Sequence, residues 1–258
     1  MSQPISWEKR ESVALVWMDN PPANLWTIES LQQLKETVKD ISLDHTVRAL
    51  VLCSRQEKFF SAGANLQQFS SGNSEVAAEV AKSFSDAFGV LDGFSGVSIA
   101  AINGLAVGGG LEVALACDIR IAGESASLGL PEARVGLLPC AGGTQMLANL
   151  VGEGWASRII LCGESVSAGQ ALKIGLVEEV VPTEELLARA IKLAQRVERQ
   201  SPSAVEQCKQ LLKKTRSQTA EQIYAAEHEA FVGLFSTEDQ QEGVNAFLQK
   251  RPAEWKNR

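Results

Sequence analysis

The segment from Ile102 to Gln145 constrains the fold and the chemistry of this chain most strongly. The apolar run that leads into it, Val97 to Ile102, predicts a buried strand. Three glycines at positions 108–110 then open an apolar run of good helix formers, so they lie at a helix N-terminus. Glycine lets backbone approach a ligand closely, and the first N–H groups of a helix are unpaired at the positive end of its dipole. This arrangement predicts a site for an oxygen atom that carries negative charge.

Two glutamates accompany these glycines. Glu112 falls in the first turn of the predicted helix, and Glu132 follows 20 residues later, between Pro131 and an apolar run. Two carboxyl groups beside an anion site indicate acid–base chemistry on a substrate whose transition state is an oxyanion. From spacing alone, a structural role is favoured: Glu112 can be stabilised by the helix dipole, and Glu132 can form an ion pair in a loop.

Composition narrows the class of protein. The 258 residues suffice for one large domain or two small ones, with a core that needs no metal or disulfide. A net charge of −7 without a block of basic residues argues against a nucleic-acid groove. The five cysteines are scattered and form no Cys-x-x-Cys pair, so neither a zinc site nor a disulfide framework is expected. With no signal peptide and no run near the ~20 apolar residues that cross a bilayer, we expect a cytoplasmic protein.

Apolar runs alternate with amphipathic segments along the first part of the chain. Strands are expected at 12–18, 47–53, 97–102, 119–122 and 127–130, and helices at 29–43, 74–91 and 144–151. This order predicts an α/β fold with mostly parallel strands. Beyond Gly154 the chain is expected to be mainly helical, with a long helix at 183–200 and later helices opened by Ser201, Thr219 and Thr237. We expect an α/β core at 1–195 and a helical part at 196–258, with no linker between them.

Several common catalytic motifs are absent. The dinucleotide pattern G-x-G-x-x-G fails because Val113 stands where its last glycine is needed. Neither a P-loop lysine nor a G-x-S-x-G elbow occurs. His45 and His228 have no evident Ser or Cys partner, so a histidine triad is not expected. Asp118 and Arg120 are expected to form a structural ion pair or turn hydrogen bond.

Five segments together resemble the enoyl-CoA hydratase/isomerase (crotonase) family over essentially the whole chain. They are NPPAN-L, SAGANL, AAINGLAVGGGLEVALACDIRIA, LGLPEARVGLLPCAGGTQ and the ending EGVNAFLQKRPAEW. The resemblance implies a crotonase-like spiral of ββα units, followed by helices that mediate trimerisation. It also implies a homotrimer or a dimer of trimers, and an acyl-CoA thioester substrate. The resemblance implies no metal and no cofactor beyond the CoA that the substrate carries. We expect neither a nucleic-acid partner nor a membrane partner.

The resemblance assigns roles to particular residues. It implies that Glu112 activates a water molecule and Glu132 supplies a proton, while the backbone N–H groups of Ala64 and Gly109 form an oxyanion hole. Residues implied to bind the substrate or its CoA are Ala62, Ala64, Asn65, Leu66 and Gly109, with Phe247 and Lys250 near the CoA nucleotide of an adjoining subunit. Four residues depart from the common family pattern: Asn65, Leu130, Cys140 and Met146. Leu130 and Cys140 flank the acyl site that the resemblance implies, so the acyl preference stays open.

The expected activity is that of an enoyl-CoA hydratase, which adds water syn to a trans-2-enoyl-CoA and gives a 3-hydroxyacyl-CoA. Two alternatives within the family stay open: a Δ3,Δ2-enoyl-CoA isomerase, for which the glutamate that matches Glu132 suffices, and a specialised acyl-CoA dehydratase. A third alternative is a non-catalytic relative that binds RNA or a partner protein. The acidic net charge argues against RNA, because binding phosphates needs Lys and Arg.

Overall fold

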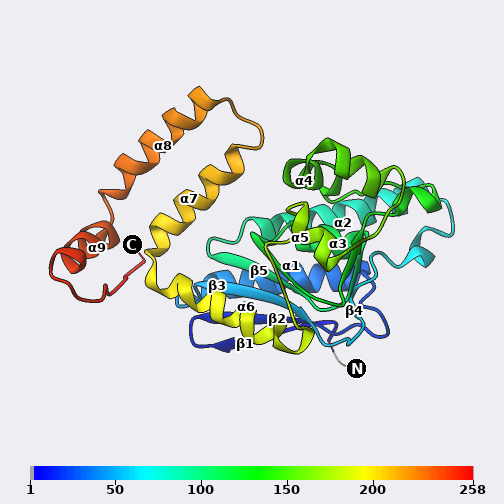
Figure 1. The fold of residues 1–258 in the computed structure, drawn as a ribbon, viewed down its shortest axis with the longest axis horizontal. Coiled ribbons are helices and arrows are strands. Elements are labelled where there is room, and N and C mark those ends of the chain that lie inside the picture. Colours follow the sequence, from blue (N-terminus) through cyan, green and yellow to red (C-terminus); the bar gives the residue numbers. More distant parts are fainter. Residues whose placement is uncertain (1–2, 258) are drawn as a thin grey trace.

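A computed structural model describes residues 3–257 as two sheets with covering helices, from which three C-terminal helices extend (Figure 1). The strands are β1 (Ile5–Arg10), β2 (Val13–Met18), β3 (Ala49–Ser54), β4 (Phe59–Ser61), β5 (Val97–Ile102), β6 (Leu105–Val107), β7 (Ile119–Gly123), β8 (Ser127–Gly129), β9 (Val166–Ser167) and β10 (Glu179–Val181). The helices are α1 (Ile28–Leu43), α2 (Ser74–Asp92), α3 (Gly109–Leu115), α4 (Gly143–Ile160), α5 (Ala168–Lys173), α6 (Leu186–Ala194), α7 (Pro202–Lys214), α8 (Ala220–Leu234) and α9 (Glu238–Leu248). Short 3-10 turns are η1 (Leu66–Phe69), η2 (Glu132–Val135), η3 (Thr183–Glu185) and η4 (Gln195–Arg199).

The larger sheet has the order β1-β2-β3-β5-β7-β10, in which only the β1–β2 pair is antiparallel. Its central strands are buried on both faces, which explains why they are nearly continuous apolar runs. On one face, α6 packs Leu186 and Ala190 against residues such as Val51 and Ile99. The opposite face carries the main core, to which α1 and α2 contribute. This sheet is the rigid layer beneath the rest of the molecule.

The smaller sheet has the order β4-β6-β8-β9, and β4, β6 and β8 are parallel. Ala106 of β6 pairs with Ser61 of β4 and with Leu128 of β8, so the three strands end side by side. Their carboxyl ends therefore open onto the same edge, which is where ligands bind in parallel sheets. This edge carries the candidate site.

The predicted α/β class with mostly parallel strands is confirmed. The strand at 97–102 has the predicted bounds, and α1 begins one residue before the predicted helix, with Thr27 and Ser30 forming its capping box. The prediction of one helix over 183–200 is wrong, because this stretch divides into η3, α6 and η4. The helix predicted at 144–151 extends to Ile160, across a kink where Gly152 takes a φ of 76°. Strands β1, β4, β6 and β9 were not predicted.

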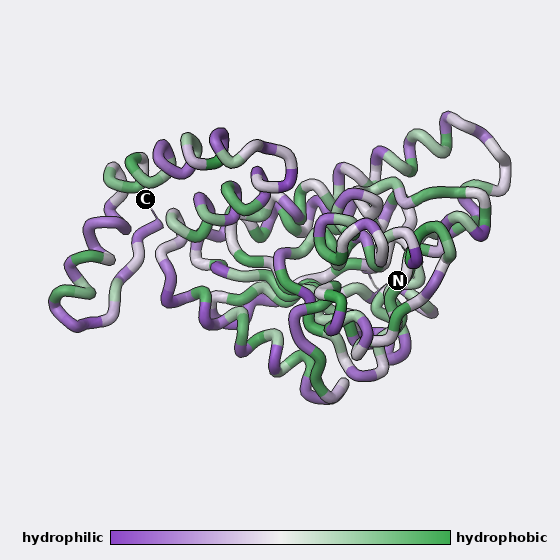
Figure 2. Tube along the Cα trace, turned by 45° about the horizontal axis from the view of Figure 1, so that its top comes forward, coloured by the Kyte–Doolittle hydropathy of each residue, from purple (hydrophilic) through white to green (hydrophobic). Residues whose placement is uncertain are grey.

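The C-terminal helices α7, α8 and α9 extend away from the two sheets (Figure 1). Ser201, Thr219 and Thr237 cap their N-termini as predicted. Apolar residues recur along this arm in the hydropathy view (Figure 2), and Phe231, Phe235 and Phe247 are more than half exposed. The proposed boundary between residues 195 and 196 stays a prediction. None of the helices described combines the length and apolar character that crossing a bilayer requires.

Candidate active site

Three loops meet at the edge of the smaller sheet, and each directly follows one of its parallel strands. β4 ends at Ser61 and leads to Ala64, β6 ends at Val107 and leads to Gly109, and β8 ends at Gly129 and leads to Glu132. The N–H of Gly108 donates to the carbonyl of Gly129 at 3.0 Å, which extends the sheet pairing up to the start of α3. The short strands thus bring together residues from three separate parts of the chain.

The loop at Ala64 is held by backbone pairing to Trp26. Trp26 N–H donates to the Gly63 carbonyl at 2.8 Å, and Asn65 N–H donates to the Trp26 carbonyl at 2.9 Å. This pairing uses the groups on both sides of Ala64 and leaves the N–H of Ala64 itself without a partner among residues 3–257. An unpaired backbone donor beside a cavity is suited to a ligand oxygen.

Gly109 opens α3, and its N–H is likewise unpaired within the described part of the chain, as expected for the first residue of a helix. The two amide-bearing loops touch. A Cβ atom at Gly63 would lie 2.8 Å from the carbonyl oxygen of Val107 and 3.4 Å from the nitrogen of Gly109. Gly63 and Gly108 both take positive φ, 87° and 56°. Close approach of these loops therefore depends on glycine.

Glu112 lies in the first turn of α3 and is only 2% exposed. Its Oε1 accepts hydrogen bonds from the N–H groups of Ala141, at 2.7 Å, and Gly143, at 3.0 Å. Burial raises the pKa of this carboxyl, whereas hydrogen bonds from peptide N–H groups oppose the rise by stabilising the carboxylate. The start of α4 thus holds the Glu112 carboxyl in place.

Glu132 begins η2, and its carboxyl lies beside the glycine loop. A Cβ atom at Gly108 would come within 3.2 Å of Glu132 Oε1. The other oxygen, Oε2, is buried and has no hydrogen-bond partner in the described part of the chain. Burial, and to a lesser extent the charge of Glu112, raises the pKa of Glu132 to about 7. This carboxyl can therefore hold or release a proton near neutral pH.

Both carboxyls and both amide-bearing residues line one cavity of about 990 Å³. The predicted residues that line it are Ala62, Ala64, Asn65, Leu66, Gly109, Glu112 and Glu132. The rest of the wall is mainly apolar and includes Phe69, Ala77, Ala81, Phe84 and Leu138. Phe247 and Lys250, predicted to serve an adjoining subunit, are not part of this cavity. Asn65 also caps η1, because its side chain accepts a hydrogen bond from Gln67 N–H.

The sequence did not predict the groups that support the site residues from the protein interior. The N–H donors to Glu112 come from the loop before α4, where only the glycine pair at 142–143 pointed to a second helix N-terminus. Trp26 gave no signal, because a single aromatic residue after a proline-rich turn resembles any other core residue. Of the four residues that depart from the family pattern, Asn65 and Cys140 line the cavity.

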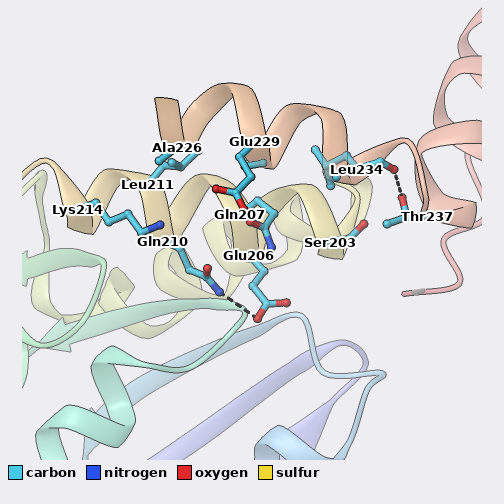
Figure 3. Close-up of a pocket in the computed structure, with 12 residues that line it drawn as sticks. Ser203, Glu206, Gln207, Gln210, Leu211, Lys214, Ala226, Glu229, Leu234 and Thr237 are labelled. Carbon is cyan, nitrogen blue, oxygen red and sulfur yellow. Dashed lines mark hydrogen bonds between the residues drawn. The ribbon is translucent and has the colours of Figure 1, made fainter. Parts of the chain in front are cut away.

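The hollow between α7 and α8 does not reproduce this combination. This hollow of about 390 Å³ is bordered by polar side chains of the two helices, such as Gln207, Gln210 and Glu229 (Figure 3). His45 and His228 are exposed and line neither hollow. Among residues 3–257, no group of three or more His, Cys, Asp and Glu is arranged to hold a metal ion.

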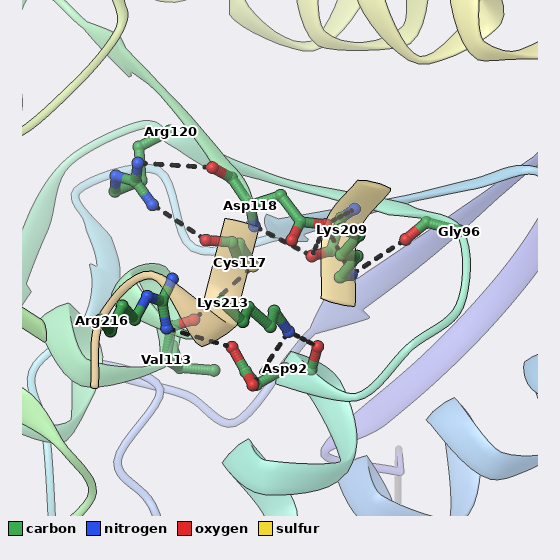
Figure 4. Close-up of polar contacts among 10 residues, drawn as sticks. Asp92, Gly96, Val113, Cys117, Asp118, Arg120, Lys209, Lys213 and Arg216 are labelled. Atoms are coloured by element: carbon green, nitrogen blue, oxygen red, sulfur yellow. Dashed lines mark hydrogen bonds and ion pairs between the residues drawn. The ribbon is translucent and has the colours of Figure 1, made fainter. Parts of the chain in front are cut away.

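Asp118 and Arg120 form the predicted turn hydrogen bond, in which Arg120 Nη2 donates to the Asp118 carbonyl at 3.4 Å, but their charged groups pair with other residues. Asp118 accepts from Lys209 of α7 at 2.7 Å and from the N–H and hydroxyl of Ser98 (Figure 4). Arg120 is buried, pairs with Glu178 and donates to backbone carbonyls, including that of Cys117. These contacts tie α7 and the segment before β10 to the larger sheet.

Comparison with known proteins identifies the class. The family described as enoyl-CoA hydratase/isomerase matches residues 8–258, and the chain belongs to this family of enzymes. The crotonase fold is shown by solved structures, among them DspI from Pseudomonas aeruginosa, with a TM-score of 0.96, 50% identity, and 99% and 97% of the two chains covered. An enoyl-CoA hydratase from Bacillus anthracis has a TM-score of 0.94 and 34% identity, covering 99% of this chain and 100% of its own.

Curated relatives agree with this assignment over nearly their whole length. One is the 2,3-dehydroadipyl-CoA hydratase of Escherichia coli, 37% identical over 251 residues, with 97% of each chain covered. Another is the short-chain-enoyl-CoA hydratase of Clostridium acetobutylicum, 37% identical over 253 residues, also with 97% of each chain covered.

Proposed function

We propose that this protein is an enoyl-CoA hydratase that adds water syn to a trans-2-enoyl-CoA and gives a 3-hydroxyacyl-CoA. The observation that supports this most is one cavity that brings together two backbone N–H groups without a partner among residues 3–257, the buried carboxyl of Glu112 and the half-buried carboxyl of Glu132. Relatives named as enoyl-CoA hydratases support it further.

In the proposed mechanism, the thioester carbonyl oxygen accepts hydrogen bonds from the N–H groups of Ala64 and Gly109. A C=C bond next to this carbonyl takes up water only if the carbonyl oxygen can accept electron density. Two fixed donors stabilise the resulting enolate-like oxygen. One such donor typically lowers the activation free energy by ~2.7–4 kcal/mol.

The two glutamates complete the reaction. Glu112, as a carboxylate, takes a proton from water while the water oxygen forms a bond to C3. Glu132, as a carboxylic acid, gives its proton to C2 as the C=C π bond breaks. The proton count balances because one proton passes to Glu112 and one leaves Glu132. Exchange with solvent then resets both groups.

The cavity wall supports a hydrocarbon acyl group. Ala77, Ala81 and Phe84 of α2 and Leu138 all line the cavity, and none of these side chains offers a polar partner. CoA enters as part of the substrate in this proposal, with no further cofactor. We further propose that the exposed aromatic residues of the C-terminal arm join copies of the chain into a homotrimer or a dimer of trimers.

The test is hydration of trans-2-enoyl-CoA thioesters of short, medium, long and branched acyl groups, followed by the loss of absorbance of the conjugated thioester. We expect activity on members of this panel and a decrease of about 10²–10⁴-fold in kcat for Glu112→Ala. A wild-type protein that binds these thioesters but hydrates none of them would refute the proposal.

The runner-up is a Δ3,Δ2-enoyl-CoA isomerase or an acyl-CoA dehydratase of the same family. One observation favours an isomerase: the pKa of Glu132 is raised to about 7, and its buried Oε2 has no partner among residues 3–257, so this carboxyl could move a proton between carbons without Glu112. Conversion of a 3-enoyl-CoA that survives in Glu112→Ala would support this alternative, because a hydratase needs both carboxyls.

A further inference from the structure

Trp26 lies directly behind both unpaired amides although it does not line the cavity. The residue is 2% exposed and belongs to the main core, whereas its neighbour Leu25 reaches the cavity wall. Trp26 is therefore shielded from the substrate, and any contribution that it makes to the reaction must act through the residues that it touches.

Its backbone fixes the first amide. In a parallel bridge, the N–H of one residue donates to the residue before the one that it faces, and its carbonyl accepts from the residue after it. Trp26 does so around Ala64, through hydrogen bonds of 2.8 Å to the Gly63 carbonyl and 2.9 Å from Asn65 N–H. Gln68 adds a bond from its Nε2 to the same Trp26 carbonyl at 3.1 Å. The orientation of the Ala64 peptide thus follows the position of Trp26.

Its indole fixes the second amide. A Cβ atom at Gly109 would lie 3.3 Å from Trp26 Cδ1 and 2.7 Å from Phe84 Cε1, so the Gly109 backbone rests on these two rings. The Trp26 and Phe84 rings each pack edge-on against Phe88, with ring centroids 5.6 and 5.4 Å apart. A cluster of three interlocked rings leaves the indole little freedom to move.

The indole acts by shape. Its Nε1–H is buried and has no hydrogen-bond partner among the described residues. A buried donor without a partner is unfavourable, so this nitrogen gives the position no polar advantage over a purely apolar ring. Another aromatic ring should therefore replace much of its contribution, whereas a small side chain should not.

We propose that Trp26 is a positioning residue that sets the separation and orientation of the Ala64 and Gly109 N–H groups. One residue supports one amide through its backbone and the other through its side chain, so removing the ring loosens one donor relative to the other. This inference rests on the proposed use of these amides to polarise a thioester carbonyl.

The test compares Trp26→Ala, Trp26→Leu and Trp26→Phe with the wild type. Displacement of about 1 Å from a productive geometry can cost about 10²-fold in rate. We expect kcat for enoyl-CoA hydration to fall about 10²-fold in Trp26→Ala and less in Trp26→Leu, with KM changed by less than about threefold. Trp26→Phe should recover most of the loss.

A second readout reports the amides directly. Carbon-13-labelled butyryl-CoA is saturated at C2–C3 and cannot be hydrated, so the infrared carbonyl stretch of the bound probe measures polarisation without turnover. We expect a lowered frequency in the wild type and a shift toward the free thioester in Trp26→Ala and Trp26→Leu. If Trp26→Ala does not fold, Trp26→Leu carries the test.

Phe94→Leu is the matched control. Phe94 is 3% exposed in the same core, but its ring packs near Lys209 and Gly96. The Phe94→Leu substitution should lower thermal stability without changing kcat or the carbonyl stretch. Folded Trp26 variants with wild-type kcat and stretch would overturn this inference alone, as would an equal loss in Phe94→Leu. If the proposed function itself is wrong, the result is different, because the wild-type protein would then hydrate no enoyl-CoA.

Discussion

At the residue scale, the two glutamates differ in what surrounds each carboxyl. Glu112 Oε1 accepts two peptide N–H bonds, which stabilise the ionised form. Glu132 Oε2 is buried without a donor among residues 3–257, which favours the protonated form. Burial raises the pKa of both carboxyls, but the N–H groups of Ala141 and Gly143 oppose that rise at Glu112. This difference in contacts supports the proposed use of Glu112 as the base and Glu132 as the acid.

The raised pKa of Glu132 predicts a specific dependence of stability on pH. Its pKa rises from an ordinary 4.5 to about 7 on folding, so the folded state holds this proton more tightly than the unfolded chain does. The associated stability is present below about pH 4.5 and is lost as pH rises through about 7. Glu132→Gln, which cannot ionise, should escape that loss. Allowing for partial solvent exposure, the variant should be more stable by about 1–2 kcal/mol at pH 8.

Thermal unfolding of both proteins at pH 5 and pH 8 measures this effect. The difference in Tm should be small at pH 5 and should favour Glu132→Gln at pH 8. The control is Glu124→Gln, an exposed carboxyl for which no comparable effect is expected. An equal Tm difference at both pH values would contradict the assigned burial of the Glu132 carboxyl.

Single residues show how far sequence reasoning reaches. The place of Glu112, Gly109 and Ala64 at one cavity was predictable, because glycine-rich and small-residue stretches of the family's motifs mark them, whereas their catalytic roles stay proposals. The support of Glu112 by Ala141 and Gly143 was not predictable, because a backbone donor has no sequence signature. The positioning role proposed for Trp26 was not predictable for a related reason, because it depends on which loops pack against this residue.

At the element scale, three short parallel strands place the site. β4, β6 and β8 have three residues each, which is too short for an alternating pattern to emerge, so β4 and β6 were not predicted. The long strands and amphipathic helices were predictable because burial dictates their periodicity. The long helix predicted at 183–200 failed because its continuous amphipathic pattern does not reveal the 3-10 turns at either end of α6.

The anchoring of α7 gives a prediction at this scale. Lys209 Nζ lies 2.7 Å from Asp118 Oδ2 and 2.9 Å from the Gly96 carbonyl, in a largely buried setting (Figure 4). Removing one partner of a buried ion pair leaves the other charge unpaired. Because Asp118 keeps some solvent contact, Lys209→Ala should lower the free energy of unfolding by about 2–3 kcal/mol.

Urea unfolding monitored by circular dichroism measures this loss. Lys214→Ala, on the same helix at an exposed position, serves as the control and should change stability by less than about 0.5 kcal/mol. Equal unfolding midpoints for the two variants would contradict an anchoring role for Lys209.

At the scale of the whole molecule, the sheet core carries a helical arm along which apolar residues recur (Figure 2), and several large ones are exposed. Phe231 and Phe235 are 64% and 61% exposed and pack edge-on against each other. Exposed apolar patches of this kind mark surfaces that bind another protein. Sequence pattern identified these helices but not their partner surface, because the partner lies outside the chain.

The proposed assembly can be tested by introducing a charged side chain into the exposed apolar surface of the arm. Phe231→Asp should weaken association of the arm, because it places a carboxylate in a surface that association would dehydrate. Light scattering coupled to size exclusion should give the mass of three or six copies for the wild type and a smaller mass for the variant. Leu43→Asp, at an apolar position 78% exposed at the end of α1, is the control and should leave the mass unchanged. A monomeric wild type would contradict the proposed homotrimer.

The most direct test of the central claim is the stereochemistry of hydration in D₂O. Glu112 and Glu132 line the same cavity beside the same amides, so both protons should be handled from one side of the bound C=C bond. Mass and nuclear magnetic resonance analysis of the 3-hydroxyacyl-CoA should then show one deuterium at C2, on the same face as the new hydroxyl at C3. Addition from opposite faces, or no hydrated product at all, would contradict the account.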